Sequence, residues 1–192
     1  MNRHIRLAAA IAVGAAFAVP AFAQNAATAA QRDANQQLRI EQGLQSGALS
    51  TREAAKLEQG EARIDRMESR ALRDGTLSGQ EAAHVNHAQS VESRAIYRQK
   101  HDAQRGDPNS LSSQRMQADV ARSAAQEQRI ANGLRDGSIG NREASALERG
   151  QARANHAQYR AGRDGHVGAH EQARVQRNES RQSRHIHAAR HN

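Results

Sequence analysis

The sequence has few of the residues from which a large hydrophobic core is built. It contains no cysteine, no tryptophan, two phenylalanines and two tyrosines in 192 residues. From Gln24 onward, 22 of 169 residues are Ile, Leu, Val or Met, and a large-aliphatic content below about a fifth is typical of disordered or marginally folded chains. Alanine, glutamine, arginine and glutamate fill the chain instead, and these residues favour helices. The composition excludes a disulfide-stapled domain and disfavours an ordinary enzyme core; it predicts thin, solvated helices around a marginal core.

Residues 1–23 have the features of a removable export leader. Arg3 and Arg6 give a positive start, residues 7–19 form an uncharged apolar run, and the leader ends in a small-x-small cleavage motif, Ala-Phe-Ala. An uncleaved membrane anchor is the alternative, but it needs about 18 apolar residues and this run is shorter. We expect a signal peptide at residues 1–23 and an exported mature chain, periplasmic or secreted, with no integral membrane span.

The chain aligns with itself at an offset of 90 residues. Matching pairs include Arg39-Ile40 with Arg129-Ile130, Gly43-Leu44 with Gly133-Leu134, and Arg52-Glu53-Ala54 with Arg142-Glu143-Ala144. A second offset of 28 residues relates stretches within each half, and repeats of this period are typical of stacked helical hairpins. We therefore predict an all-α fold of two duplicated three-helix units, at residues 24–104 and 112–192, joined by a linker at residues 105–111.

Each repeat junction carries residues that end one helix and begin the next. A glycine precedes an aliphatic residue, which is followed by a small residue and, three positions later, a glutamate. Ser50 with Glu53 and Ser78 with Glu81 have the spacing of capping boxes, in which the hydroxyl and the carboxylate satisfy unpaired backbone N–H groups. The predicted helices cover residues 28–45, 51–73, 79–103, 112–135, 141–162 and 169–189.

The second predicted helix carries a heptad seam, and the two halves differ along it. The seam residues recur at spacings of three and four: Leu57, Gly60, Ile64, Met67 and Ala71. A glycine inside a helix is unfavourable by about 1 kcal/mol, so its recurrence as Gly150 suggests the close approach of another backbone. At the offset of 90, large residues are lost: Ile64 becomes Ala154, Met67 becomes Ala157, Leu72 becomes Gly162 and Tyr97 becomes His187. We expect the C-terminal half to be loose or partly disordered.

The junctions resemble the second half of a calcium-binding EF-hand loop. Asp74 and Glu81 stand at the fifth and twelfth positions of such a loop, and Asp136 and Glu143 do so in the second half of the chain. An arginine and a leucine occupy the first and third positions of the first loop, where Ca²⁺ needs oxygen ligands. Helix capping explains the same residues, so a cation site at these four carboxylates is the alternative interpretation.

The junction residues also resemble the Leu-Thr-x-x-Gln motif of the Spy/CpxP-type family of small periplasmic helical proteins. The matching segments are Leu49-Ser50-Thr51-Arg52-Glu53 and Leu77-Ser78-Gly79-Gln80-Glu81, in which Ser replaces Thr and Glu replaces Gln. The resemblance covers these two short turns. It implies an exported, basic, all-helical protein that binds unfolded chains or takes part in envelope stress without a cofactor.

Ten histidines raise the question of a metal site near the C-terminus. His187 and His191 lie four residues apart, a spacing that places both rings on one helix face. Two ligands are fewer than the three or four that a zinc site takes from a protein. Solvated histidines on polar faces are the simpler interpretation, and the metal site stays the alternative.

The last predicted helix carries a cationic stripe. Its arginines recur at spacings of three, four and three: Arg174, Arg177, Arg181 and Arg184. Such a stripe can bind phosphates, lipopolysaccharide or an acidic protein through charge, with a strong dependence on salt. An ordinary solvated helix face is the competing interpretation.

No catalytic motif was found, so the sequence predicts a non-enzymatic, exported helical repeat protein. The partner is expected to be a protein or an anionic envelope component, and no cofactor is expected. Nucleic acid is disfavoured because the chain has too few aromatics for base stacking. A homo-oligomer stays open, and a cation-binding role is the rival function.

Overall fold

A computed structural model describes residues 21–192, with side chains from Ala26 onward. It is all-helical, as predicted. The predicted leader falls on residues 1–20, outside the described part, except for residues 21–23, which begin the first helix. The helices are α1 (Ala21–Gln45), α2 (Thr51–Ala71), α3 (Gly79–Lys100), α4 (Leu111–Asp136), α5 (Asn141–Gly162) and α6 (Ala169–Arg190).

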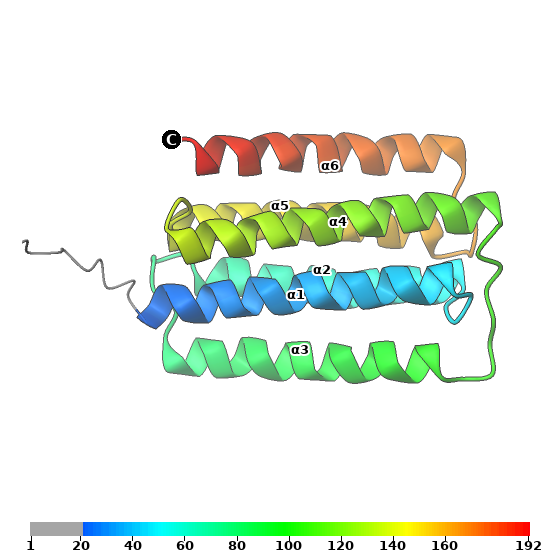
Figure 1. Cartoon of the computed structure of the whole chain (residues 1–192), viewed down its shortest axis with the longest axis horizontal. Coiled ribbons are helices and arrows are strands. Elements are labelled where there is room, and N and C mark those ends of the chain that lie inside the picture. Colours follow the sequence, from blue (N-terminus) through cyan, green and yellow to red (C-terminus); the bar gives the residue numbers. More distant parts are fainter. Residues whose placement is uncertain (1–20) are drawn as a thin grey trace, which may run out of the picture.

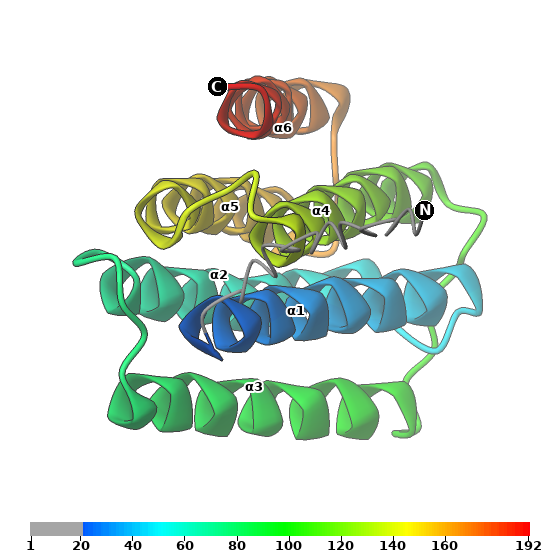
Figure 2. The same ribbon diagram turned by 60° about the vertical axis from the view of Figure 1, so that its left-hand side comes forward.

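The helices stack in four layers (Figures 1 and 2). Helices α1 and α2 lie side by side in one inner layer and α4 and α5 in the other, while α3 and α6 form the two outer layers. The most extensive contacts join α1 to α4 and α2 to α5, which are corresponding helices of the two repeats. The four inner helices therefore form a central bundle that is shared between the halves.

Contacts at the junctions follow the same pseudo-two-fold relationship. A guanidinium nitrogen of Arg52 donates to the backbone oxygen of Asp164 at 2.7 Å, and Nε of Arg142 donates to that of Asp74 at 3.2 Å. Each arginine lies near a junction glycine with positive φ, Gly165 or Gly75. Each half thus contacts the turn of the other through corresponding arginines.

The capping residues explain the helix starts. Ser50 accepts a hydrogen bond from the backbone N–H of Glu53, whose carboxylate accepts from Ser50 in return. Ser78 and Glu81 form the same capping box. The predicted helix bounds are confirmed to within three residues, except that α1 begins earlier, at Ala21.

Apolar side chains gather in two clusters at opposite ends of the bundle, and each cluster draws on both halves. The large residues of the first cluster are Leu72, Leu77, Ile130, Leu134, Ile139, Leu147 and Ile186. Those of the second are Ile40, Leu44, Leu49, Leu57, Ile96, Met116, Val120, Val167 and Val175. Between them, the middle turns of the helices contribute buried carboxyl and amide side chains. The bundle thus has a polar belt enclosed by two apolar ends.

The expectation of a loose or partly disordered C-terminal half is wrong. Helices α4, α5 and α6 are complete and bury residues along their length. The small residues of this half allow close packing: a Cβ at Gly162 would collide with Met116 and lie 3.0 Å from the Cβ of Ala55 in the first half. The space beside Gly162 is therefore filled by Met116 of the same half and by Ala55 of the first half.

The recurring helix glycines also have a different neighbour from the one expected. A Cβ at Gly60 would meet the Glu92 carboxylate of α3, and one at Gly150 would meet the Gln182 amide of α6. The close approach is thus made by side chains of the outer helices, and not by another backbone. Within residues 21–192, no helix combines the length and hydropathy that a membrane span requires.

Candidate metal centre

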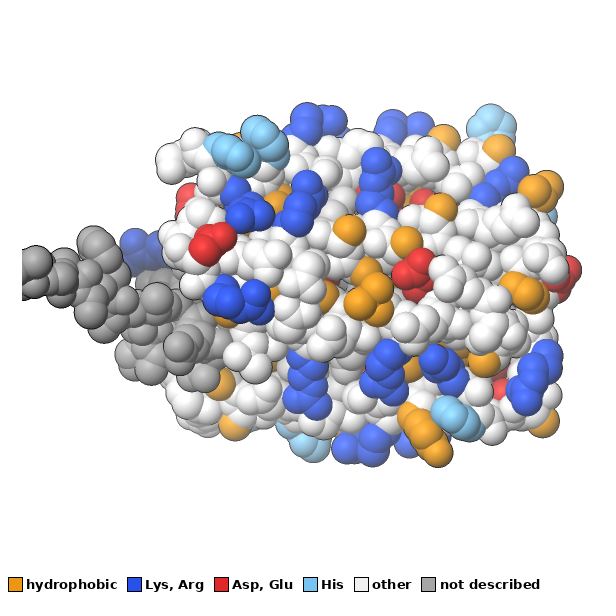
Figure 3. All heavy atoms as spheres, viewed as in Figure 1, with side chains coloured by type: hydrophobic (Ala, Val, Ile, Leu, Met, Phe, Trp, Pro, Cys, Tyr) orange, Lys and Arg blue, Asp and Glu red, His pale blue; other side chains and the backbone are white. Residues whose placement is uncertain are grey.

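The interior of the bundle is rich in acidic side chains. Ten of the 20 acidic residues of the chain are buried: Asp33, Glu53, Glu58, Glu61, Asp65, Glu68, Asp119, Glu127, Glu148 and Glu179. In the described part of the chain, no lysine or arginine is buried, and of these ten only Glu179 has an ion pair, to Arg122 at 3.4 Å. The outer surface is correspondingly basic, with Lys and Arg side chains spread over every layer of the face in Figure 3. Burying unpaired charge is strongly unfavourable, so buried carboxyl groups with neither an ion pair nor hydrogen-bond donors favour binding a proton or a cation.

Three of these side chains converge between three helices. Asp65 of α2, Glu127 of α4 and Glu148 of α5 each place one carboxylate oxygen within 4.8 Å of the other two. We call these residues the central carboxylate cluster. Oxygens on opposite sides of a bound cation lie roughly 4–5 Å apart, because metal–oxygen distances are about 2.0–2.6 Å. The cluster therefore has the span of a metal-ligand set, and it is the one such group among residues 26–192.

Hydrogen bonding within the protein does not account for these oxygens. Neither oxygen of Glu127 accepts a hydrogen bond of suitable length and angle, and neither do Oδ1 of Asp65 and Oε2 of Glu148. The fully buried amide of Gln151 also makes no such hydrogen bond, although it lies near enough to Glu127 to favour the charged form of that carboxyl. Buried polar groups in native proteins are nearly always satisfied, so this set points to an additional ligand.

Burial raises the pKa of all three carboxyl groups of the cluster well above their usual values. Neighbouring charge adds to the effect: Glu148 raises the pKa of Asp65 and Glu127 further, and Asp33 does so for Glu148. A metal-free cluster therefore stays protonated at pH values where exposed carboxylates are ionised. A bound cation would displace those protons.

A second acidic pair from α1 and α2 flanks the cluster. Nε2 of Gln89 donates to Oδ1 of Asp33 at 2.7 Å and lies 3.1 Å from Oε1 of Glu68. Burial raises the pKa of Asp33 to about 7. Burial also raises the pKa of Glu68 well above its usual value, with Asp33 as the next largest cause. The pair adds negative potential beside the cluster, which increases its attraction for a cation.

The repeat supplies an internal comparison for the cluster. At the offset of 90, Asp65 corresponds to Asn155, Glu127 to Gln37 and Glu148 to Glu58; we call Asn155, Gln37 and Glu58 the sister set. In the sister set, Nε2 of Gln37 donates to Oε2 of Glu58 at 3.0 Å. Nδ2 of Asn155 donates to Oδ2 of Asp65 at 3.0 Å, and its Oδ1 accepts from Ser123. The sister-set amides thus donate to one oxygen of Glu58 and to one oxygen of Asp65, whereas neither oxygen of Glu127 accepts a hydrogen bond of suitable length and angle.

The cation ligands suggested by the sequence lie elsewhere, at the surface. Asp74 and Asp136 are exposed, and each accepts hydrogen bonds from the residue two positions later, Thr76 or Ser138. Glu81 and Glu143 accept from backbone N–H groups at the starts of α3 and α5. The described residues place no third ligand beside these carboxylates.

The two candidate histidines do not converge on a common point. The rings of His187 and His191 stack at 4.2 Å between centroids, and Nδ1 of His191 lies 2.7 Å from the backbone oxygen of His187. Their nitrogens are therefore not arranged around a shared ion. The four arginines of the predicted stripe are all exposed on α6.

The central carboxylate cluster was not predicted from the sequence, although the sequence carries a sign of it. In α2 the buried acids recur at spacings of three, four and three, as Glu58, Glu61, Asp65 and Glu68. The matching positions of α5 are also polar and buried: Glu148, Gln151, Asn155 and Gln158. A polar stripe that recurs in both repeats, with amides replacing acids, indicates an interior position.

Comparisons with known proteins add no assignment. No protein-family model matches the sequence, and neither a curated protein nor a solved structure matches it.

Proposed function

We propose that this protein binds a hard divalent cation inside its central helix bundle, with the central carboxylate cluster as the ligand set. The observation that carries the proposal is the convergence of Asp65, Glu127 and Glu148 within 4.8 Å, where neither oxygen of Glu127 accepts a hydrogen bond of suitable length and angle. The sequence prediction of a leader supports placing this function outside the cytoplasm.

The ligand chemistry favours Ca²⁺ or Mn²⁺. All three ligands are carboxylates, and carboxylate oxygens suit hard cations, whereas Zn²⁺ and Cu²⁺ prefer imidazole and thiolate. The side chains are at most 1 % exposed, which disfavours an ion that keeps several waters, as Mg²⁺ usually does. The same enclosure leaves no room for an organic substrate, so the proposal is for metal binding and not for metal-dependent catalysis.

A small cavity adjoins the cluster. It has a volume of about 10 Å³, roughly one water molecule, and its apolar lining includes Ala26, Leu72 and Val85. Glu68 and Glu148 also line it. The cavity therefore borders both the flanking pair, through Glu68, and the cluster, through Glu148.

The test uses calorimetric titration of chelator-treated protein with Mn²⁺ and with Ca²⁺ at pH 8. The expected result is one ion per chain. The variant Asp65→Asn/Glu127→Gln, which copies the residues of the sister set, should lose binding while keeping its helical circular dichroism.

The matched control is Asp74→Asn/Glu143→Gln, which removes the same two charges at the surface junctions and should bind as the parent does. Binding that is equal in both variants, or absent from the parent, would contradict the proposal. In the latter case protons alone neutralise the cluster.

A further inference from the structure

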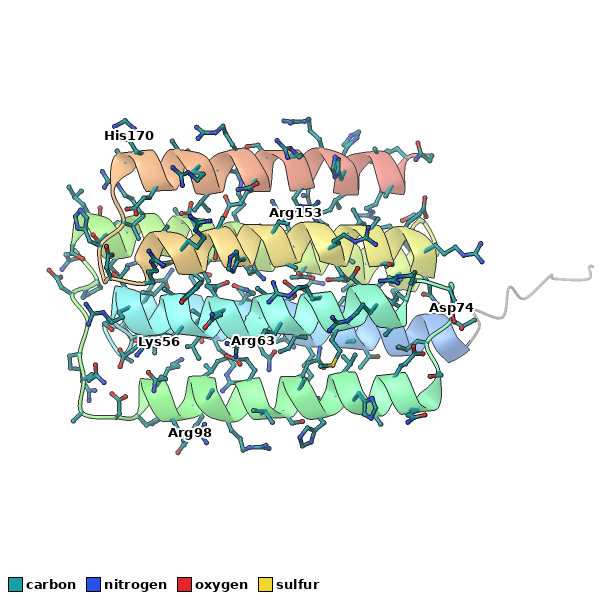
Figure 4. The ribbon with its side chains drawn as sticks, turned by 180° about the vertical axis from the view of Figure 1, so that it is seen from behind. Lys56, Arg63, Asp74, Arg98, Arg153 and His170 are labelled. Carbon is teal, nitrogen blue, oxygen red and sulfur yellow. The ribbon has the colours of Figure 1, made fainter. Side chains whose placement is uncertain are left out.

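A second candidate site lies on the surface between α5 and α6. A cleft of about 380 Å³ is lined there by four arginines, Arg153, Arg160, Arg163 and Arg174, which we call the arginine cleft. Arg153 projects from α5 towards α6 in Figure 4. Volumes of about 300–1,000 Å³ are typical of small-molecule sites.

The positive charge of the cleft is not neutralised by the protein. None of its four arginines takes part in an ion pair or a side-chain hydrogen bond within residues 26–192. Two acids also line the cleft, but both are engaged in local structure: Asp164 accepts from the backbone N–H of His166, and Glu171 accepts from that of Gly168. The cleft therefore presents a net positive surface to solvent.

The first repeat shows what the second has lost at this position. There, Arg63 lies close enough to Glu92 to lower the pKa of that carboxyl, against the larger effect of burial. At the offset of 90, Arg63 becomes Arg153, whereas Glu92 becomes Gln182. The second repeat has thus kept the arginine and replaced its acidic neighbour with an amide.

The same comparison explains the space in the cleft. Ala157 lines it and corresponds to the half-buried Met67 of the first repeat. A methionine at position 157 would project into the cleft. The loss of this side chain, which the sequence suggested would loosen the C-terminal half, instead leaves room beside unpaired arginines.

We propose that the arginine cleft binds a ligand carrying a diphosphate or two neighbouring phosphate monoesters. Planar guanidinium groups bind phosphate oxygens in pairs, and four arginines match a ligand with several negative charges. No aromatic side chain except His156 lines the cleft, so the phosphates and not a stacked base are recognised. The ligand is either a soluble phosphorylated compound or the phosphorylated headgroup of an envelope lipid.

This site differs from the cationic stripe predicted from the sequence. Of the four stripe residues, only Arg174 lines the cleft. Arg181 lines a neighbouring cavity of about 10 Å³ with Arg153. The cleft thus combines arginines of α5 and its C-terminal cap with one arginine of α6, whereas the predicted stripe has four arginines along α6.

The test measures binding of pyrophosphate by calorimetry, and of vesicles containing phosphatidic acid by sedimentation. Arg153→Gln/Arg160→Gln should weaken binding by about tenfold or more, since charge-assisted hydrogen bonds are lost. Ala157→Met, which keeps every charge and copies the first repeat, should weaken it by a similar factor by filling the cleft.

The control is Arg177→Gln/Arg184→Gln, which removes two exposed charges outside the cleft and should change affinity by less than about twofold. Circular dichroism of each variant establishes that it is folded. Equal losses in the control and the cleft variants, an unaffected Ala157→Met variant, or no binding of either probe would overturn the proposal. If pyrophosphate competes with the vesicles, the soluble compound and the lipid headgroup bind at this one site. If only one probe binds, that probe identifies the source of the phosphates.

Discussion

At the scale of single residues, the two repeats differ by exchanges of acid for amide that are almost isosteric. Glu127 and Gln37 occupy corresponding positions, and only the glutamine donates a hydrogen bond to the neighbouring glutamate, Glu58. The amide N–H therefore does in one repeat what a cation is proposed to do in the other. In the proposed function, the exchange of a carboxylate oxygen for an amide nitrogen at this position removes the need for a cation.

This relationship predicts that a second site can be built. In the variant Gln37→Glu/Asn155→Asp, the sister set becomes three carboxylates, so calorimetry should show two Mn²⁺ ions per chain in place of one. The control Gln80→Glu/Asn86→Asp adds the same charges at exposed positions and should leave one ion per chain. A stoichiometry of one in both variants would show that the repeats are not equivalent at this position.

At the scale of the helices, the sequence was informative because helix ends are fixed locally. Capping serines, junction glycines and glutamates three positions later lie within a few residues of one another, so the starts of α2, α3, α5 and α6 were placed correctly. Whether a helix face is buried is not fixed by neighbouring residues in this way, because it depends on which helices pack against that face. The acids of α2 resemble a solvated face in the sequence, and only the packing of α1, α3, α4 and α5 around α2 shows that they are buried.

The caps of the second repeat are incomplete, which allows a stability prediction. Glu143 and Glu171 keep their half of the capping box, but glycines at 140 and 168 replace the serines of the first repeat. Both glycines have the extended backbone of a serine cap, and an added Cβ would lie 3.4 Å or more from its nearest neighbours.

The variant Gly140→Ser/Gly168→Ser should therefore be stabilised by a few tenths of a kcal/mol per site, raising the melting temperature by about 1–2 °C. In the first repeat, Ser50→Ala removes an existing side-chain cap and should destabilise the protein by about 1 kcal/mol. Thermal denaturation followed by circular dichroism measures both. An unchanged or lower melting temperature in the serine variant would mean that the added hydroxyls do not cap.

At the scale of the whole molecule, the two repeats build one shared interior by packing against each other. Both apolar clusters contain large side chains from each repeat, and the central carboxylate cluster joins α2 of the first repeat to α4 and α5 of the second. The sequence indicated the duplication but not this sharing, because the offset of 90 relates residues without showing whether they meet. Treating each repeat as self-sufficient led to the wrong expectation about the C-terminal half.

Separated halves should therefore not fold alone. Residues 24–104 and 105–192, expressed individually, are each expected to lack a stable monomeric fold, because each loses roughly half of both apolar clusters. Mixed in equal amounts, they should form a one-to-one complex with restored helicity, as judged by analytical ultracentrifugation and circular dichroism. A monomeric half that melts cooperatively would contradict this view of the fold.

The buried acids also predict an unusual dependence of stability on pH. Burial raises the pKa of Glu58 to about 8, and it raises that of Asp33 to about 7. The folded metal-free protein therefore binds more protons than the unfolded chain, in which carboxyl groups titrate near pH 4–4.5. The contribution of these groups to the stability of the fold is therefore greatest below about pH 4.5 and is lost as the pH rises to about 8. The loss is about 1.4 kcal/mol per pH unit for each group that titrates.

The melting temperature of metal-free protein should accordingly be higher at pH 5 than at pH 8. Added Mn²⁺ should stabilise the protein at pH 8 far more than at pH 5, because the ion competes with protons for the carboxylates of the cluster. Asp65→Asn/Glu127→Gln should keep part of the metal-free decline, since Asp33 and Glu58 remain, but should lose the effect of Mn²⁺. Thermal scans of both proteins at the two pH values measure this. A metal effect of equal size at pH 5 and pH 8 would place the ion away from the buried acids, because ligands that are already ionised at pH 5 have no protons to release.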